Sequence, residues 1–196
     1  MHKPQCVVIL DFGAQYTQLI ARRVRECGVF SEVLPYTTAI EDIQAKEPRG
    51  IILSGGPASV LAADAPKCDK AIFDMDVPVL GICYGMQLMA YLLDGEAAAC
   101  DQREYGRTPT VMDQTDSGLL GGLREASHCW MSHTFQVVNL PGGFEGIAHT
   151  DCCPFAAMAD EQRKLYGVQF HPEVTHTEEG CRILRNFLID ICGLKG

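Results

Sequence analysis

The chain has 196 residues, 47% of them hydrophobic, a size that favours one well-packed domain spanning residues 1–196. A formal net charge of −9 excludes the basic surface that a nucleic-acid-binding protein needs. No segment reaches the roughly 20 apolar residues that span a bilayer, and the N-terminus lacks the apolar core of a signal peptide. We therefore expect a cytoplasmic protein without membrane or nucleic-acid partners.

The ten cysteines predict neither a disulfide framework nor a metal site. In a cytoplasmic protein thiols stay reduced. Cys152 and Cys153 are adjacent, and no Cys-x-x-Cys pair occurs. His133 and His176 invite a metal or second-base hypothesis, but we interpret both as hydrogen-bonded loop histidines. The prediction is therefore no metal and no cofactor in this chain.

The first half of the chain alternates between strand and helix patterns. Residues 6–11 form a continuous apolar run, typical of a strand buried on both faces of a parallel sheet. A helix is predicted at 16–27, strands at 30–34 and 50–54, a helix near 66–73, and a fourth strand before Cys83. With right-handed crossovers, this order predicts an α/β doubly wound, mostly parallel sheet with helices on both faces and its site at the strand C-terminal ends.

After about residue 95 the pattern changes to short strands separated by Gly, Pro, Asp and Ser. These pieces lie at 110–112, 129–131, 135–138, 146–148 and 156–158. They predict antiparallel β-hairpins added to the same sheet. Residues 165–170 return to the core, and residues 178–191 are expected to form a closing amphipathic helix.

Cys83 lies in a Gly-x-Cys-x-Gly turn between an apolar strand and a helix-forming stretch. Gly81 and Gly85 let the chain turn tightly enough to hold a nucleophile in a strained conformation above the end of the sheet. An isolated cysteine is more often a buried small apolar residue. The strand, the turn and the following helix together favour a presented, catalytic thiol.

His171 and Glu173 follow a second apolar strand, at i and i+2 around Pro172. Proline keeps the preceding residue extended, so both side chains point to one face. Glu173 can then orient the imidazole of His171 and stabilise its charged form. A helix N-terminus and a neighbouring imidazolium lower a thiol pKa to ~4–7, so a Cys83–His171–Glu173 catalytic relay is predicted.

Gly55-Gly56-Pro57 ends the strand expected beside the one that carries Cys83. Such a Gly-Gly pair is usually only a turn. Here the backbone N–H of Gly56 and that of Tyr84, next to the nucleophile, can form an oxyanion hole. A phosphate loop is excluded because the Walker spacing and its lysine are missing.

Together these residues resemble the class I glutamine amidotransferases, the triad glutaminases. Five stretches are similar, more narrowly, to the glutaminase domain of the GMP synthetase family: residues 10–26, 51–57, 81–87, 130–133 and 167–177. The resemblance covers about residues 6–193. It implies a flavodoxin-like class I glutamine amidotransferase fold, with an added antiparallel β-hairpin region.

The resemblance also implies a reaction. Cys83 would attack the side-chain amide of glutamine, His171 would protonate the departing ammonia, and Glu173 would hold His171. Gly56 and Tyr84 would bind the oxyanions of a thioester pathway. Gln87, Ser132 and His133 correspond to substrate-binding positions of the family. For Gln87, the alternative is a solvated helix residue.

In the resembling enzymes, the ammonia passes to an ATP pyrophosphatase module that adenylates XMP and aminates it to GMP. The Ser-Gly-Gly-x-Asp-Ser loop of that module occurs nowhere in this chain. We therefore expect the synthetase to be a partner domain or subunit, with ATP and Mg bound only there. Either a truncated chain or a separately encoded subunit fits this expectation.

One departure from the family pattern covers two positions. Gly-Asp usually follows Met131-Ser132-His133, whereas this chain has Thr134-Phe135. Losing the aspartate is expected to weaken binding of the glutamine α-amino group by about 1–3 kcal/mol, unless Glu145 or Asp151 compensates.

Two alternatives to this assignment remain open. One is another thiol enzyme on the same scaffold, either a peptidase or the glutaminase subunit of a different amidotransferase. The other is an impaired regulatory or binding module in which Phe135 blocks the glutamine pocket.

Overall fold

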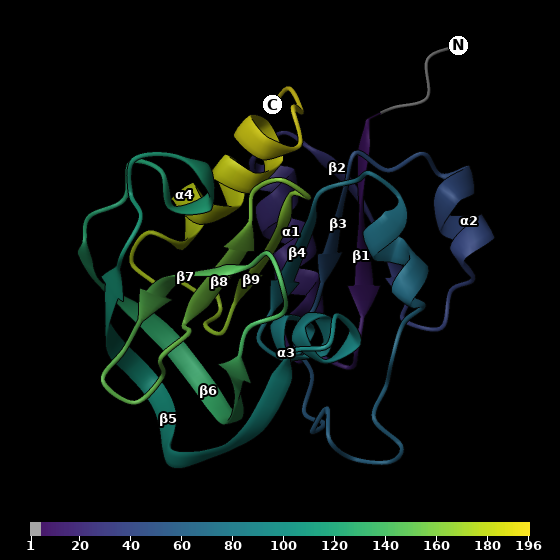
Figure 1. The fold of residues 1–196 in the computed structure, drawn as a ribbon. Helices are drawn as coiled ribbons and strands as arrows, with labels where there is room; N and C mark the ends of the chain where they lie inside the picture. Colours follow the sequence, from purple (N-terminus) through teal and green to yellow (C-terminus); the bar gives the residue numbers. More distant parts are fainter. Residues whose placement is uncertain (1–4) are drawn as a thin grey trace.

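The fold is a nine-stranded mixed β-sheet covered by helices on both faces (Figure 1). The structure is a computed structural model and describes residues 5–196. The strand order is β2-β1-β3-β4-β9-β8-β7-β5-β6. The strands are β1 (Cys6–Asp11), β2 (Phe30–Pro35), β3 (Gly50–Leu53), β4 (Val79–Ile82), β5 (Glu96–Met112), β6 (Ala126–Asn139), β7 (Glu145–His149), β8 (Ala157–Asp160) and β9 (Leu165–Val168).

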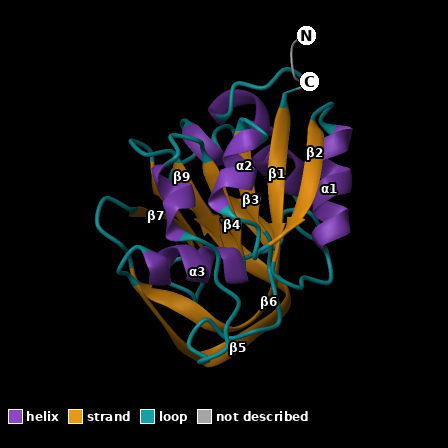
Figure 2. Ribbon diagram, turned by 90° about the vertical axis from the view of Figure 1, so that its right-hand side faces the viewer, coloured by secondary structure: helices purple, strands orange, loops and turns teal. Residues whose placement is uncertain are grey.

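Two apolar cores lie on the two faces of the parallel part of the sheet. Figure 2 shows α2 and α3 on one face and α1 on the other. The α-helices are α1 (Thr17–Glu26), α2 (Ile40–Ala45), α3 (Tyr84–Leu92) and α4 (Gly180–Arg185). Buried residues of α1 and α4 share one core, and those of α2 and α3 share the other. Within residues 5–196, no helix is long and apolar enough to cross a bilayer.

Five neighbouring strands, β2, β1, β3, β4 and β9, run parallel. Strands β3 and β4 are fully buried, as expected for strands covered by helices on both sides. Because they are parallel, their C-terminal ends meet at the same edge of the sheet. The turns that follow β3, β4 and β9 are therefore neighbours in space, and these turns carry the predicted site.

The antiparallel part is built differently from the predicted short hairpins. Residues expected as separate strands at 110–112, 129–131 and 135–138 belong to two long strands, β5 with 17 residues and β6 with 14. Their pairing continues through polar residues because alternate side chains of an antiparallel ribbon can face water. A register shift between Ala99 and Glu104 marks an irregularity in the pairing, as in a β-bulge.

Two expected helices are shorter or irregular. The helix expected near 66–73 is only a 3-10 turn, η1 (Lys70–Asp74), whose N-cap Asp69 accepts a hydrogen bond from the Ala71 N–H. The expected helix 178–191 begins as α4 and continues as a π-helix, η3 (Asn186–Ile191). Helix α2 and the short 3-10 turn η2 (Gly118–Leu120) were not predicted. The predicted fold class, an α/β mostly parallel sheet with an antiparallel addition, is confirmed.

Candidate active site

The predicted catalytic residues meet at the C-terminal ends of β3, β4 and β9. These strands are adjacent in the sheet, so the turns containing Gly56, Cys83 and His171 surround one cavity of about 390 Å³. That volume lies within the range of small-molecule sites. The cavity is lined by Gly13, Ala14, Gln15, Tyr16, Gly56, Pro57, Ala58, Cys83, Tyr84, Gln87, Tyr105, Ser132, His133, Thr134, Phe135 and His171.

Cys83 occupies a strained turn between β4 and α3. Its backbone has φ +55° and ψ −109°, a conformation that residues with a side chain rarely adopt. The strain falls on the cysteine itself, whereas the two flanking glycines permit close packing. A Cβ on Gly81 would lie 2.6 Å from the Gly85 carbonyl carbon, and one on Gly85 would lie 2.5 Å from the Leu53 oxygen.

The thiol of Cys83 is largely covered, although it borders the cavity. The residue is 6% exposed, less than a freely presented thiol would be. Its Sγ lies 3.9 Å from the Ser132 carbonyl oxygen and 3.5 Å from Nε2 of Gln169. A reagent therefore reaches the sulfur through the cavity and not from the outer surface.

His171 and Glu173 form a buried pair beside the thiol. Nδ1 of His171 lies 2.5 Å from Oε1 of Glu173, which leaves Nε2 for Cys83. Burial by itself lowers the pKa of His171, but hydrogen bonding to Cys83 and Glu173 and the charges of both groups outweigh burial and raise the pKa to about 10. This shift favours the imidazolium form of the ring, which lies between Cys83 and the carboxylate of Glu173.

Several supports of this pair escaped the sequence analysis. Arg23 Nε donates to the backbone oxygen of Glu173 at 2.9 Å. The Thr177 hydroxyl donates to the backbone oxygen of His171 at 2.7 Å and accepts from the Trp130 N–H at 2.9 Å. Arg23 lies 150 residues from Glu173, so no local pattern could reveal it. Gln169 and Thr177, in contrast, lie within residues 167–177, the stretch that the sequence had already singled out around His171. Their place in that stretch was the signal that could have identified them.

The two predicted oxyanion donors border the cavity. Tyr84 is the first residue of α3, where backbone N–H groups have no acceptor within the helix. Gly56 has no room for a side chain, because a Cβ there would lie 2.6 Å from the Phe12 oxygen. Ser54 fixes this turn, since its hydroxyl accepts from the Phe12 N–H and donates to the Gly55 oxygen, both at 2.9 Å. Their role as oxyanion donors stays a prediction.

The three predicted substrate-binding residues also line the cavity, Gln87 from α3 and both Ser132 and His133 from β6. Gln87 is 4% exposed, so the alternative of a solvated helix residue is wrong. Its Nε2 donates to the Phe135 oxygen at 2.9 Å and to Oε1 of Gln169 at 3.2 Å. A direct contact with substrate remains a prediction for all three.

Thr134 and Phe135 form part of the cavity wall. Among the described residues, none that lines this cavity carries a carboxylate. Glu145 accepts a hydrogen bond from Gln114, and Asp151 lines a separate cavity, so the structure places neither where it could compensate. His176 is exposed, and its ring lies tilted against that of Trp130 with the ring centroids 4.8 Å apart. The prediction of a loop histidine is wrong for His133, which is buried within strand β6, although it is hydrogen-bonded as expected.

This α/β domain brings a strained cysteine, which follows one parallel strand, next to an imidazole–carboxylate pair, which follows the neighbouring strand. A family model described as "Glutamine amidotransferase class-I" matches residues 8–191. The chain therefore belongs to the class I glutamine amidotransferase family.

Two curated relatives of this chain are larger than the chain itself. A protein named GMP synthase [glutamine-hydrolyzing] from Clostridium perfringens is 57% identical over 189 residues, covering 96% of this chain and 37% of that protein. The protein of the same name from Acetivibrio thermocellus is 55% identical over 192 residues, covering 98% and 37%. The chain thus spans about 37% of the length of these curated relatives.

Solved structures show the same fold. A protein described as a putative GMP synthase subunit, from Thermoplasma acidophilum, superposes with a TM-score of 0.84 at 31% identity, covering 98% of this chain and 96% of that one. A glutamine amidotransferase from Thermotoga maritima superposes with a TM-score of 0.77, covering 98% and 100%. At 16% identity, the second likeness concerns the fold alone.

Proposed function

We propose that this chain hydrolyses glutamine to glutamate and ammonia, as the glutaminase part of a GMP synthase. The observation that carries the proposal is the placement of Cys83 and His171 on one cavity, with Glu173 bonded to the far side of the ring. The 57% identity to a glutamine-hydrolysing GMP synthase supports the particular assignment.

In the first half of the reaction, the Cys83 thiolate attacks the side-chain amide carbon of glutamine. The carbonyl oxygen becomes an oxyanion, and the backbone N–H groups of Gly56 and Tyr84 stabilise it. His171 then donates its Nε2 proton to the amide nitrogen, ammonia leaves, and a thioester remains. Glu173 keeps Nδ1 protonated and the ring correctly turned.

In the second half, the now neutral His171 takes a proton from water, and the hydroxide attacks the thioester carbon. The C–S bond of the second tetrahedral intermediate breaks, which restores the Cys83 thiolate and the imidazolium and releases glutamate. The same two N–H groups serve both oxyanions. No group outside the triad, water and substrate is needed to balance these steps.

The ammonia would pass to a synthetase partner that converts XMP to GMP with ATP. Support comes from the relatives, whose remaining length is not represented in this chain. ATP and Mg belong to that partner in this proposal. Tyr105, which lines the cavity, is 61% exposed.

Covalent labelling tests the proposed activity. A diazoketone analogue of glutamine is expected to modify Cys83 alone among the ten cysteines, and excess glutamine is expected to prevent it. Mass spectrometry of the digested protein identifies the labelled residue. Cleavage of peptides would instead support the peptidase alternative, and an intact fold without labelling would support the impaired binding module.

Replacing Phe135 with aspartate is expected to strengthen glutamine binding. The cavity wall lacks a carboxylate, and an anion opposite the substrate ammonium should lower the glutamine KM about 5- to 100-fold. Steady-state glutaminase assays measure the change, with Phe135→Asn as the uncharged control. An equal gain in both variants would show that removing the ring, and not adding the charge, improves binding.

A further inference from the structure

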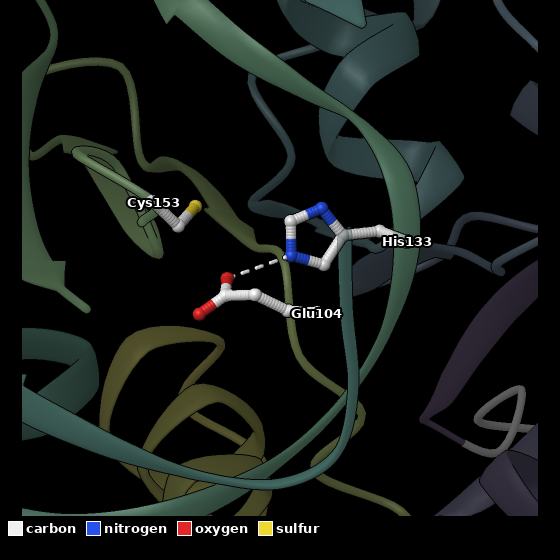
Figure 3. Close-up of side chains that lie close together, drawn as sticks. All are labelled: Glu104, His133 and Cys153. Atoms are coloured by element: carbon white, nitrogen blue, oxygen red, sulfur yellow. Dashed lines mark hydrogen bonds and ion pairs between the residues drawn. The ribbon is translucent and has the colours of Figure 1, made fainter. Parts of the chain in front are cut away.

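Behind the cavity wall, Glu104 of β5, His133 of β6 and Cys153 of the β7–β8 loop converge (Figure 3). All three residues are buried, and their ligand-type atoms lie within 4.8 Å of one another. His133 also lines the cavity, whereas Glu104 and Cys153 do not. The proposed reaction assigns no role to Glu104, although burying an isolated carboxylate is costly.

The hydrogen bonds of Glu104 and His133 are complete. Oε1 of Glu104 lies 3.0 Å from Nε2 of His133, and Oε2 accepts from the Thr150 hydroxyl at 2.7 Å. Nδ1 of His133 lies 3.1 Å from the backbone oxygen of Phe135, which can only accept. Sγ of Cys100 also lies 3.5 Å from Nδ1. The ring is therefore held by the Glu104 carboxylate on one side, and by the Phe135 carbonyl and the Cys100 thiol on the other.

This pair connects directly to the groups around the nucleophile. The Phe135 oxygen that His133 contacts is also the acceptor for Nε2 of Gln87, at 2.9 Å. Gln87 bonds to Gln169, whose Nε2 lies 3.5 Å from Sγ of Cys83. A continuous chain of polar contacts thus runs from buried Glu104 to the reactive sulfur, and His133 is the link that crosses the cavity wall.

Carboxylate, imidazole and thiol are also the donor types of zinc sites. Here, however, both nitrogens of His133 and both oxygens of Glu104 already have partners inside the protein. Burial raises the pKa of the Cys153 thiol to about 12, which opposes the thiolate that a metal requires. The contacts favour a closed hydrogen-bond network over a metal centre.

We propose that Glu104 is a positioning residue for glutamine, acting through His133. It holds the ring so that the 132–135 segment keeps its place against Gln87 and above Cys83. Without the carboxylate, Nε2 of the buried His133 ring loses its hydrogen-bond partner, so the ring leaves Phe135 and the cavity wall relaxes. This inference rests on the proposed glutaminase function.

Two reagents distinguish positioning from general damage. The diazoketone analogue must be recognised as glutamine, whereas iodoacetamide needs only an accessible, reactive Cys83. In Glu104→Ala, labelling of Cys83 by subsaturating analogue is expected to slow about 10- to 100-fold, and alkylation by iodoacetamide less than about 3-fold. Glu104→Gln keeps an acceptor for Nε2 and is expected to regain most of the lost rate.

Asp160→Ala is the matched control. Asp160 is a buried acid paired with Arg163 at 2.6 Å on β8, and it does not line the cavity. This variant is expected to change thermal stability while leaving the ratio of the two labelling rates as in the wild type. If Glu104→Ala does not fold, Glu104→Asp can replace it, because the side chain is shorter by one methylene and the carboxylate moves away from His133. Labelling by the analogue is again expected to slow more than alkylation by iodoacetamide.

Three results would overturn the positioning role. The first is an unchanged analogue rate in Glu104→Ala, and the second is equal slowing of both reagents, which indicates a merely structural role. The third is stoichiometric zinc in the purified wild type that Glu104→Ala loses. A wild-type protein that the analogue never labels would overturn the glutaminase proposal itself, and the positioning role with it.

Discussion

Replacing Cys83 with alanine is expected to lower glutamine hydrolysis at least about 1,000-fold, because the thioester can no longer form. The cavity and the His171–Glu173 pair remain, so the fold should be kept. Glutaminase assays, with circular dichroism to verify folding, measure the outcome. Labelling by the glutamine analogue should disappear as well.

Cys181→Ser provides the matched control for that substitution. Cys181 lies on α4, is exposed, and does not line the cavity that contains Cys83. Its replacement is expected to leave the rate within about two-fold of the wild type, as is usual for surface substitutions. Activity of Cys83→Ala above a tenth of the wild-type rate would contradict a covalent role for the sulfur.

Glu173→Gln is expected to lower kcat about 100- to 10,000-fold with a smaller change in KM. The neutral amide can present its NH₂ group to Nδ1 and hold the wrong tautomer, and it no longer stabilises the imidazolium. Steady-state kinetics at neutral pH measure the loss. Glu145→Gln, an exposed acid away from the cavity, serves as the control and should be unaffected.

The same substitution should change how stability depends on pH. The pKa of His171 is raised from 6.5 to about 10 in the folded protein, so the stabilisation of its charged form is complete below pH 6.5 and is lost as the pH rises through 10. The wild type should therefore exceed Glu173→Gln in unfolding free energy most near pH 6.5, with the gap narrowing towards pH 10. Urea unfolding of both proteins at pH 6.5, 8 and 10 provides the measurement. An equal difference in unfolding free energy at all three pH values would contradict the expectation.

The inner strands β1, β3 and β4 of the parallel half were predictable because they are buried on both faces and appear as apolar runs. The long β5–β6 ribbon was only partly predictable. Its stabilising contacts are hydrogen bonds between residues as far apart in sequence as Glu96 and Asn139, and its polar positions look like breaks in a strand. The π-helical end of the chain carries no sequence signal that distinguishes it from an α-helix.

For the candidate site, local sequence was enough to single out Cys83, His171 and Glu173. The conformations of the Gly-x-Cys-x-Gly turn and of the extended His-Pro-Glu stretch each depend on a few neighbouring residues, because backbone preferences act at short range. The order of β3, β4 and β9 in the sheet then brings the two stretches to one cavity.

The sequence by itself therefore determined the class of fold, and it singled out the candidate nucleophile and its histidine–carboxylate pair. Only the tertiary structure decided what holds them: Arg23 against Glu173, Gln169 beside the thiol, and Glu104 behind His133. The physical reason is that propensities and motifs act between neighbours in the chain. Hydrogen bonds of buried groups depend on which distant segments pack together, and no local pattern records that choice.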